Sequence, residues 1–540
     1  MGEPKLHGLM MDDYPLSLTA VIERAELLTP GRKVVYRRPD CKVHRTTMGD
    51  CAVRARRLAS ALAELGVEEG DRVGTLMWNQ PEHLEAYYGV PSMGAVIHTL
   101  NPRLHPDELG FIAGDAEDKA LIIDESLLGV LDSFKDAYSF EHVIVVSHSG
   151  DVPEGTTDYE ELIEGQEPMS WPAPDERRAC AICYTSGTTG RPKGVLYSHR
   201  ALVLHSFMAA LPDQMNISMR DTVLPVVPMF HANAWGIPYT ATMAGASLVL
   251  PGPHLDAESI LDLLADEKCT LTAGVPTVWM AMLKAIEAEP ERWDLSGLKR
   301  LLVGGSAVPK SMIEGYQKHD LFIVQGWGMT ETSPLASTST VPPELDDTAD
   351  DEKFDYRARQ GTPAPFVDIR ARGDDGELIP WDDEAMGELE VRGPWVAAAY
   401  FQGTGAEKFT DDGWFQTGDV VKINQQGCIR ITDRSKDLVK SGGEWISSVD
   451  MENLLMGHPA VAEAAVIAVP DEKWDERPMA IVVLKDGAEA TPDDLRAHLS
   501  SNFAKWQLPE RVEFIDEIPR TATGKFKKTS LREQYVKTPV

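Results

Sequence analysis

The amino-acid sequence predicts an α/β protein with a large N-terminal domain of doubly wound sheets, a small β-barrel subdomain and a small α+β C-terminal domain. Its 540 residues correspond to three or four units of roughly 150 residues each. Apolar segments typical of buried strands alternate with helical periods over most of the chain, which is typical of parallel sheets covered by helices. From about residue 361 the pattern changes to short segments separated by glycine-rich turns.

Helix and strand patterns follow one another from residue 50 onward. Residues 50–66 place Ala, Leu and Val three and four positions apart, which predicts an amphipathic helix that ends at Gly66. Residues 71–78 are typical of a buried strand. The segments that continue the alternation of strand and helix lie at 83–100, 119–131 and 142–147.

The last third of the chain is expected to contain a loop, a β-rich part and a separate domain. The acidic stretch 343–355 is typical of a solvated loop. Residues 361–433 predict β-hairpins and a barrel-like subdomain. A boundary near residue 433 gives a large domain of residues 1–433 and a C-terminal domain of residues 434–540, which is long enough to fold separately. Helices are expected in this last domain at 449–456 and 492–502.

The composition is that of an ordinary globular protein, with 43% hydrophobic and 25% charged residues. The net charge of −33 argues against nucleic acid as a partner, because contacts to phosphate backbones need a basic surface. Six cysteines in so long a chain do not make a disulfide framework and suit a reducing compartment. We read no signal peptide and no apolar run long enough to span a membrane, so we expect a cytoplasmic enzyme.

A glycine- and hydroxyl-rich loop at 184–194, YTSGTTGRPKG, is the strongest local signal. Its glycines let backbone N–H groups turn toward a phosphate, its hydroxyls can donate to phosphate oxygens, and Lys193 adds a positive charge. It is not a Walker A loop, because Pro192 precedes the lysine and Gly194 follows it. The expected phosphate ligands are Thr185, Ser186, Gly187, Thr188, Thr189, Gly190 and Lys193.

Cys180 and Cys183 form a C-x-x-C pair, a pattern that can indicate a redox or zinc site. No second cysteine pair and no histidine cluster is spaced for zinc in this sequence. Because the pair lies on an apolar segment that leads into the phosphate loop, we expect a structural role.

Eight motifs, in one order, resemble those of the adenylate-forming superfamily of acyl-CoA synthetases, peptide-synthetase adenylation domains and luciferases. After the phosphate loop come PMFH (228–231), VGGSAVP (303–309), GWGMTE (326–331), TGD (417–419), DRSKD (433–437), KSGGEWIS (440–447) and PRTATGK (519–525). The resemblance covers essentially the whole chain. Three details resemble medium- and long-chain fatty acyl-CoA synthetases and, equally, their methylmercaptopropionate-CoA ligase relatives: HANAWG (231–236), SGGEWISS (441–448) and KWDERP (473–478).

The resemblance implies a reaction in two halves. A carboxylate attacks the α-phosphorus of Mg-ATP, giving an acyl-adenylate and pyrophosphate. The thiol of CoA then attacks the acyl carbon and expels AMP. Phosphoryl chemistry of this kind needs positioning and charge neutralisation more than covalent help.

The resemblance also implies which residues hold the metal and the nucleotide. Glu331 and the hydroxyl of Thr185 would bind Mg²⁺, which takes few protein ligands. Asp419 would accept hydrogen bonds from the ribose hydroxyls with Arg434 nearby, and Trp327 would offer an aromatic face beside the base. The other residues expected around the adenine are Gly304, Gly305, Ser306, Ala307, Gln325, Gly326, Gly328, Met329 and Thr330.

Lys525 is the residue that we expect to be catalytic, together with His231 and Glu331. Residues 519–540 hold six basic side chains against one acidic residue, Glu533, which suits a segment that meets a polyanionic ligand. In the resemblance, the lysine at this position bridges the attacking carboxylate and the α-phosphate, where a flexible point charge is useful.

His231, Trp235 and Gly305 are expected to line the acyl site. By resemblance, His231 lies at the mouth of the pocket, where it either takes part in the chemistry or only lines the wall. Trp235 matches the position that gates the acyl tunnel in long-chain synthetases. Its sequence neighbours offer no cation for a second carboxylate, which favours an apolar tail.

Thioester formation is expected to use a different surface. The resemblance implies that the C-terminal domain is mobile and rotates after adenylation, so that Lys525 leaves the site and the segment after the hinge enters it. Lys436 occupies the hinge position, where the family often has Asp. The residues expected on the CoA side are Lys440, Gly442, Gly443, Glu444 and Trp445.

The sequence therefore predicts an ATP-dependent, AMP-forming ligase that joins a medium- to long-chain aliphatic carboxylic acid to CoA. The alternatives are a ligase for 3-methylmercaptopropionate or another short-chain acid, an acyl-AMP ligase that serves a carrier protein, and a non-catalytic acyl-nucleotide-binding protein. Intact Glu331, Asp419, Arg434 and Lys525 argue against the last of these. Because relatives often pair through their large domains, a homodimer is also expected.

Overall fold

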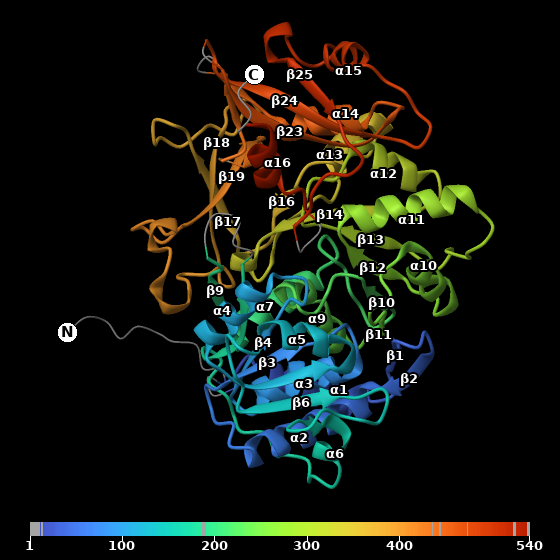
Figure 1. The fold of residues 1–540 in the computed structure, drawn as a ribbon, viewed down its shortest axis with the longest axis vertical. Coiled ribbons are helices and arrows are strands. Elements are labelled where there is room, and N and C mark those ends of the chain that lie inside the picture. Colours follow the sequence, from blue (N-terminus) through green and yellow to red (C-terminus); the bar gives the residue numbers. More distant parts are fainter. Residues whose placement is uncertain are drawn as a thin grey trace.

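The structure is a computed structural model that describes residues 11, 14–185, 191–434, 436–441, 444–471, 473–521 and 525–536. In this part of the chain the strands form four sheets (Figure 1). The two larger sheets and their helices precede residue 364, and the two smaller sheets follow it. The α/β class predicted from the sequence is thus confirmed.

The first large sheet has seven strands in the order β7-β6-β5-β3-β4-β8-β9. Its strand pairs are parallel except for β8 and β9, which form an antiparallel edge. The strand bounds are β3 Arg72–Leu76, β4 Val96–Thr99, β5 Asp118–Asp124, β6 His142–Val146, β7 Thr157–Asp158, β8 Ala179–Tyr184 and β9 Gly194–Ser198.

The second large sheet has nine strands in the order β16-β15-β14-β13-β12-β10-β11-β1-β2. Its central strands, from β14 to β1, pair in parallel. The strand bounds are β1 Lys33–Arg37, β2 Val43–Thr47, β10 Thr222–Pro225, β11 Ser247–Leu250, β12 Leu271–Gly274, β13 Arg300–Val303, β14 Ile323–Gly328, β15 Leu335–Thr338 and β16 Thr362–Pro363.

Helices cover both faces of the two large sheets. One core contains apolar residues of both sheets and of the helices between them: α1 Leu18–Leu28, α2 Met48–Glu64, α3 Pro81–Ser92, α7 His199–Ala209 and α9 Ile237–Ala244. The outer face of the first sheet packs on α4 Pro106–Ala116 and α5 Leu128–Phe134. The outer face of the second sheet packs on α10 Ala257–Asp266, α11 Pro276–Ala288 and α12 Lys310–Gln317. These layers confirm the doubly wound arrangement.

The helix predicted at 50–66 is α2, and the reasons for its two ends can be read from the sequence. Thr47 accepts a hydrogen bond from the backbone of Asp50, whose carboxylate in turn accepts one from the backbone of Thr47. The helix ends before Gly66, which has a φ of +84°. The apolar face of α2 packs against α3, as the amphipathic pattern predicts. Its buried alanines and leucines are Ala52, Ala55, Leu58, Ala59, Ala61 and Leu62.

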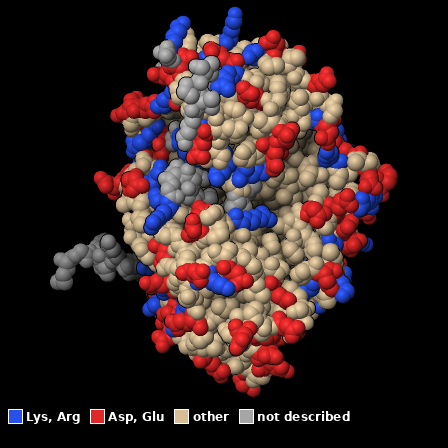
Figure 2. Space-filling view, in the orientation of Figure 1, with Lys and Arg blue, Asp and Glu red and all other residues tan. Residues whose placement is uncertain are grey.

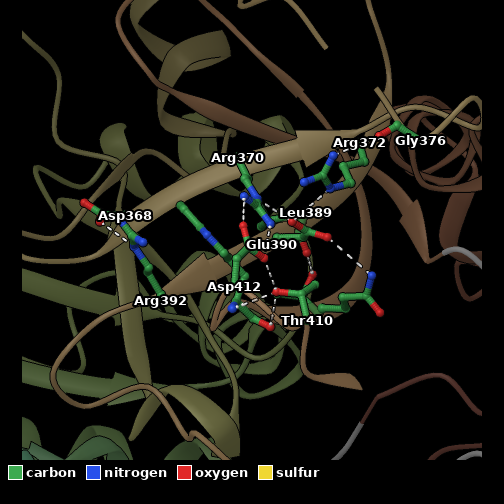
Figure 3. Close-up of polar contacts among 12 residues, drawn as sticks. Asp368, Arg370, Arg372, Gly376, Leu389, Glu390, Arg392, Thr410 and Asp412 are labelled. Carbon is green, nitrogen blue, oxygen red and sulfur yellow. Dashed lines mark hydrogen bonds and ion pairs between the residues drawn. The ribbon is translucent and has the colours of Figure 1, made fainter. Parts of the chain in front are cut away.

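The hairpins predicted after residue 361 form a four-stranded antiparallel sheet, β17-β18-β19-β20. Its strands are β17 Asp368–Arg372, β18 Gly387–Arg392, β19 Phe415–Ile423 and β20 Ile429–Arg434. Arg370 lies between the carboxylates of Glu390 and Asp412 at 2.5 and 2.7 Å, and these contacts tie β17 to β18 and to the following loop (Figure 3). In the described residues β17 and β20 are the two edges of this sheet and do not pair, so the expected barrel is not closed.

The fourth sheet, β22-β21-β24-β23 with β25 beside β24, belongs to the C-terminal part of the chain. Its strands are β21 Val439–Ser441, β22 Glu444–Ile446, β23 Val461–Asp471, β24 Asp475–Leu484 and β25 Arg511–Phe514. Two helices, α14 Ser448–Met456 and α15 Pro492–Leu499, pack on one face, and α16 Lys528–Tyr535 packs on the other. These two helices correspond to those expected at 449–456 and 492–502. The domain division at residue 433 stays a prediction.

The acidic stretch 343–355 is partly helical, which corrects the loop prediction. Helix α13, Asp350–Arg357, begins with three acidic residues in its first turn, where the helix dipole favours negative charge. At its end the buried Arg357 donates to the backbone carbonyl of Ile323 in β14. The helix therefore fastens to the large sheet, a long-range contact that a local charge pattern does not reveal.

The remaining α-helices of the described residues are short: α6 Tyr159–Ile163 and α8 Ala232–Trp235. No helix in the described part of the chain is long and apolar enough to cross a membrane. Cys180 and Cys183 are free and buried on β8, where burial raises the pKa of the Cys183 thiol to about 11. Such thiols are unreactive, as expected for a structural pair.

Candidate active site

The loops that follow β10, β12, β13 and β14 meet at one edge of the nine-stranded sheet. Because these strands are parallel, their carboxyl ends lie side by side, which is where ligands of doubly wound sheets bind. His231 and Trp235 follow β10, Gly304 to Ala307 follow β13, and Met329 to Glu331 follow β14. Segments that are far apart in the sequence are thus brought to one place.

A group of Lys and Arg side chains lies near the middle of the face in Figure 2, where the surface is hollowed between the upper and lower parts of the molecule. Elsewhere on this face acidic residues are abundant, in keeping with the net charge of −33. A basic hollow on an acidic protein suits a polyanionic ligand.

Asp419, on β19, is shared by two of the predicted nucleotide residues. The indole Nε1 of Trp327 donates to its Oδ2 at 2.9 Å, and Nε of Arg434 lies 2.7 Å from its Oδ1. Asp419 is 1% exposed, so its charge is compensated by these partners rather than by bulk water. A carboxylate accepts about four hydrogen bonds, and the described residues supply two, which leaves room for ribose hydroxyls.

Glu331, at the end of the GWGMTE motif, is buried and held by a residue that the sequence analysis missed. The hydroxyl of Tyr400 donates to Oε1 of Glu331 at 2.6 Å. The backbone carbonyl of Glu331 accepts from the N–H of Ala397 at 2.7 Å. Next to it, the Thr330 carbonyl accepts from Tyr197 at 2.7 Å. No local pattern pointed to Tyr400, because it lies 69 positions away on a different element.

Lys525 reaches this edge from the far end of the chain. A β-carbon built on Gly305, which has a φ of +87°, would lie 4.0 Å from Cε of Lys525. Burial, followed by the positive charge of Arg434, lowers the pKa of Lys525 to about 8, while the charges of Asp419 and Glu331 act in the opposite direction. The predicted catalytic, ribose and metal residues are therefore brought within electrostatic reach of one another.

His231 lies close enough to Lys525 for the charge of the lysine to act on its imidazole. Burial and, after it, the charges of Lys525 and Arg103 lower the pKa of His231 to about 4, so its imidazole is neutral at pH 7. Arg103 was not expected from the sequence. Its guanidinium lies 5.7 Å from the ring centroid of Phe230, and burial lowers its pKa.

Trp235 belongs to a left-handed turn. The four residues Ala232, Asn233, Ala234 and Trp235 have φ values between 43° and 57°, a region that L-residues avoid at about 1–2 kcal/mol each. Gly236 continues the turn at φ +72°, and a β-carbon there would lie 2.8 Å from Nδ1 of the buried His205. The turn is strained and over-determined by its surroundings, as is common at functional sites.

The turn sets the indole of Trp235 against the loop after β13. A β-carbon built on Gly304 would lie 3.2 Å from Cη2 of Trp235 and 3.0 Å from the carbonyl oxygen of Gly326. The thiol of Cys183 on β8 donates to Oδ1 of Asn233 at 3.1 Å and so holds the turn on the neighbouring sheet. Trp235 thus closes one wall of the site.

The base of the phosphate loop is formed as a short ladder. The Thr185 N–H donates to the Lys193 carbonyl at 3.0 Å, and the Lys193 N–H donates to the Thr185 hydroxyl at 3.2 Å. The Lys193 amine lies 3.7 Å from a carboxylate oxygen of Glu407 and 5.0 Å from the ring centroid of Tyr400. The expected ligands Ser186, Gly187, Thr188, Thr189 and Gly190 lie outside the described residues.

The residues predicted for the CoA side are not at this edge. Lys440 and Trp445 line a separate cavity of about 270 Å³ between the hairpin β21–β22 and the sheet β17–β20. The Lys440 amine lies 5.1 Å from the ring centroid of Trp445 and 3.8 Å from Oδ2 of Asp374. Gly442 and Gly443 lie outside the described residues, as does the side chain of Glu444. Lys436 lies between β20 and β21, and its side chain is exposed.

The residues expected to hold Mg²⁺ fit that ion. Glu331 offers a carboxylate and Thr185 a hydroxyl, the hard oxygen donors that Mg²⁺ prefers. In the described part of the chain no group of three or more His, Cys, Asp and Glu could hold a metal by itself. The remaining ligands would therefore be phosphate oxygens and water, as is usual for Mg²⁺ bound with a nucleotide.

Two family models match this chain. The family described as AMP-binding enzyme matches residues 22–401, and the AMP-binding enzyme C-terminal domain matches residues 450–525. This chain belongs to the AMP-binding enzyme family.

Among its relatives, the long-chain-fatty-acid–CoA ligase of Thermus thermophilus is 48% identical over 97% of this chain and 96% of its own length. The medium-chain-fatty-acid–CoA ligase of Ectopseudomonas oleovorans is 42% identical over 98% of this chain and 97% of its own. The 3-methylmercaptopropionyl-CoA ligase of Ruegeria lacuscaerulensis is also 42% identical, over 98% of both chains.

Among solved structures, the anthranilate CoA ligase AuaEII in complex with anthranoyl-AMP has a TM-score of 0.86 at 26% identity and covers 97% of this chain and 99% of its own. ATP-bound MatB from Rhodopseudomonas palustris has a TM-score of 0.82 at 26% identity, with 96% and 99% covered. Both the fold and the nucleotide-using class are therefore those expected from the motifs.

Proposed function

We propose that this chain is an ATP-dependent, AMP-forming ligase that joins a medium- to long-chain aliphatic carboxylic acid to CoA through an acyl-adenylate. The observation that supports this most is the approach of Lys525 to Gly305, with the charges of Asp419 and Glu331 acting on its amine. The amine of Lys525 would then neutralise the negative charge that develops when a carboxylate attacks the α-phosphorus. Relatives named as fatty-acid–CoA ligases, similar over nearly their whole length, support the substrate class.

In the first half-reaction, a carboxylate oxygen of the acid forms a bond to the α-phosphorus of ATP, and the bond from that phosphorus to pyrophosphate breaks. Lys525 neutralises charge on the carboxylate and the α-phosphate as negative charge moves to the leaving group. Asp419 orients the ribose, and Thr185 and Glu331 would hold Mg²⁺, which when bound would neutralise phosphate charge.

In the second half-reaction, the thiol of CoA loses its proton to solvent and its sulfur forms a bond to the acyl carbon. The bond from that carbon to the phosphate oxygen breaks, and AMP leaves. His231 is neutral at pH 7 and can therefore accept a hydrogen bond near the acyl carbon. We propose that the C-terminal part turns about Lys436 between the two steps, which exchanges Lys525 for the segment that contains Lys440 and Trp445.

The side chains beside the acyl wall favour an apolar tail. Trp235 and its neighbours Ala232, Ala234 and Ile237 present no charge. The charges of Lys525 and, after it, Arg103 act on His231, at the carboxylate end of the proposed site. A second carboxylate along the tail would lack a partner there, and burying it would be costly.

A ligase for 3-methylmercaptopropionate is the second candidate. Two relatives of that name, from Ruegeria lacuscaerulensis and Ruegeria pomeroyi, are 42% and 41% identical to this chain. This identity is about that of the medium-chain relative, so overall similarity does not separate the two acids.

A panel of acids from propionate through 3-methylmercaptopropionate to palmitate tests the proposal. We expect ATP–pyrophosphate exchange that depends on the acid, and AMP release that depends on CoA, both greatest with an aliphatic acid of medium or long chain. A maximum at 3-methylmercaptopropionate favours the second candidate. Exchange without use of CoA indicates an acyl-AMP ligase, and binding of acyl-adenylate without exchange indicates a non-catalytic protein.

Two further expectations remain predictions. A homodimer through the large domain is checked by light scattering together with ultracentrifugation. A cytoplasmic location is checked by fractionation of the cells that make the protein.

A further inference from the structure

We propose that Lys528 is a positioning residue, which fixes the C-terminal part of the chain in the orientation that brings Lys525 to the adenylation site. This inference rests on the proposed function, because it concerns which half-reaction the orientation serves. Lys528 begins α16, three residues after Lys525. The side chain of Lys528 contacts helix α14.

The amine of Lys528 is fixed on helix α14. It lies 2.7 Å from Oε1 of Glu452 and donates to the hydroxyl of Ser448 at 2.6 Å. The same Glu452 oxygen accepts from the backbone of Val466 at 2.7 Å. Because the Lys528 side chain is only 12% exposed, water does little to weaken these contacts.

Ser448 connects this amine to the other side of the proposed hinge at Lys436. The Ser448 N–H donates to Oδ2 of Asp433 at 2.8 Å, and Asp433, the penultimate residue of β20, is only 1% exposed. Beside it, the hydroxyl of Ser447 donates to the carbonyl of Thr432. The start of α14 is thus attached to the sheet that carries Asp419.

The charges around Lys528 come from both sides of Lys436. Burial raises the pKa of the Asp433 carboxyl, and the positive charge of Lys528 opposes that rise. Burial would lower the pKa of Lys528, but the charges of Glu452, Asp433 and Asp437 raise it overall. Lys528 therefore stays protonated and compensates a carboxylate that belongs to the large domain.

One turn further along α16, Arg532 pairs with Asp437, the residue after Lys436. The helix that follows the catalytic loop therefore contacts α14 through Lys528 and the residue after the hinge through Arg532. Both contacts lie on the same face of α16, since their cations are four residues apart.

A turn about Lys436 would not affect these contacts equally. Glu452 and Lys528 both follow the hinge and would move together, so their ion pair would persist. Ser448 and Asp433 lie on opposite sides of the hinge, so their contact, and with it the influence of Lys528 on Asp433, would be lost. An interaction present in one orientation only shifts the equilibrium toward that orientation.

The variant Lys528→Met tests this in the full chain, with Lys528→Arg and Asp433→Asn beside it. We expect Lys528→Met to lower acid-dependent ATP–pyrophosphate exchange by about 10-fold, within the usual range of coupling between states. Thioester formation from preformed acyl-AMP and CoA should stay within about twofold of the parent. Lys528→Arg should restore much of the exchange, and Asp433→Asn should resemble Lys528→Met.

Arg496→Met is the matched control, because Arg496 pairs with Asp493 inside α15 and, among the described residues, contacts only the C-terminal side of the hinge. Its partners, including the carbonyls of Pro509 and Glu510, all follow the hinge. It should lower thermal stability without changing the ratio of the two half-reactions. If Lys528→Met lowers both halves in the same proportion, or neither, the inference is overturned.

Distance measurements between spin labels give a readout that does not depend on activity. One label at Met219 of the large domain and one at Glu489 of the C-terminal part, both exposed, would follow the orientation after Cys41→Ser removes the exposed thiol. Lys528→Met should add a second distance that is minor in the parent and rare with Lys528→Arg. An unchanged distribution overturns the inference even if the parent ligates no acid, whereas a parent without exchange counts only against the proposed function.

Discussion

Trp327 and Asp419 are joined by a hydrogen bond of 2.9 Å from the indole to the carboxylate, across 92 positions of sequence. The bond connects β14, in the large nine-stranded sheet, to β19, in the four-stranded sheet. Its partners come from the motifs expected at the adenine and at the ribose. The relative position of these two sheets therefore sets the distance between the two halves of the nucleoside site.

Lys525→Ala should separate the two half-reactions. Loss of a pre-organised cation is expected to slow adenylation by about 10²–10³-fold. The same variant, supplied with acyl-AMP and CoA, should form thioester at nearly the parent rate, because Lys525 would have left the site by then. Equal loss in both assays would contradict the proposed exchange of segments.

The pH dependence of adenylation should report Lys525. Its pKa is lowered to about 8 in the folded protein, and the protonated amine is the active form. The kcat/KM for ATP, which reflects the free enzyme, should therefore fall as pH rises through about 8. Lys525→Arg, whose side chain stays charged, should move this limb upward. A profile that is flat to pH 10 would contradict the assignment.

Glu331→Gln should weaken the dependence of adenylation on Mg²⁺. The amide keeps the size of the side chain but removes a charged oxygen ligand, so we expect a loss of more than about 100-fold at limiting Mg²⁺. Tyr400→Phe removes only the hydrogen bond to Glu331 and should cost about 10-fold. Titration with Mg²⁺ measures both, and a full parental rate at low Mg²⁺ would remove Glu331 from the metal site.

Trp235→Ala should change the preference for acyl chain length. The indole closes a wall beside Gly304, so its removal opens space for the tail. The ratio of kcat/KM between a short and a long acid should shift by about 10-fold or more. The KM for ATP should stay within about twofold. An unaltered acid profile would assign Trp235 to packing alone.

Gly361→Ala should destabilise the fold without a direct effect on chemistry. Gly361 has a φ of +80°, and a β-carbon there would lie 1.8 Å from the carbonyl oxygen of Thr338 in β15. We expect the free energy of unfolding to fall by more than about 2 kcal/mol, visible in denaturant titration. Gly403→Ala, also at positive φ but with open space around its β-carbon, is the control and should lose less.

Much of the fold and of the site could be predicted from the sequence, because the motifs lie at the ends of strands whose apolar patterns are strong. The helix α2, the buried strands and the meeting of Lys525 with Asp419 and Glu331 all follow from local patterns or from motif order. Tyr400, Arg103 and the helix α13 could not be predicted. Each contacts or acts on a residue that is distant in sequence. Local sequence patterns do not reveal which distant residues meet in the fold.

The left-handed turn that carries Trp235 has a consequence for chemical synthesis of the protein. Ala234, at φ +49° and ψ +41°, has the backbone geometry that a mirror-image residue adopts without penalty. A semisynthetic chain with D-alanine at this position should therefore unfold at a higher temperature than the natural one. The difference in unfolding temperature between the two chains would then measure the backbone strain at Ala234.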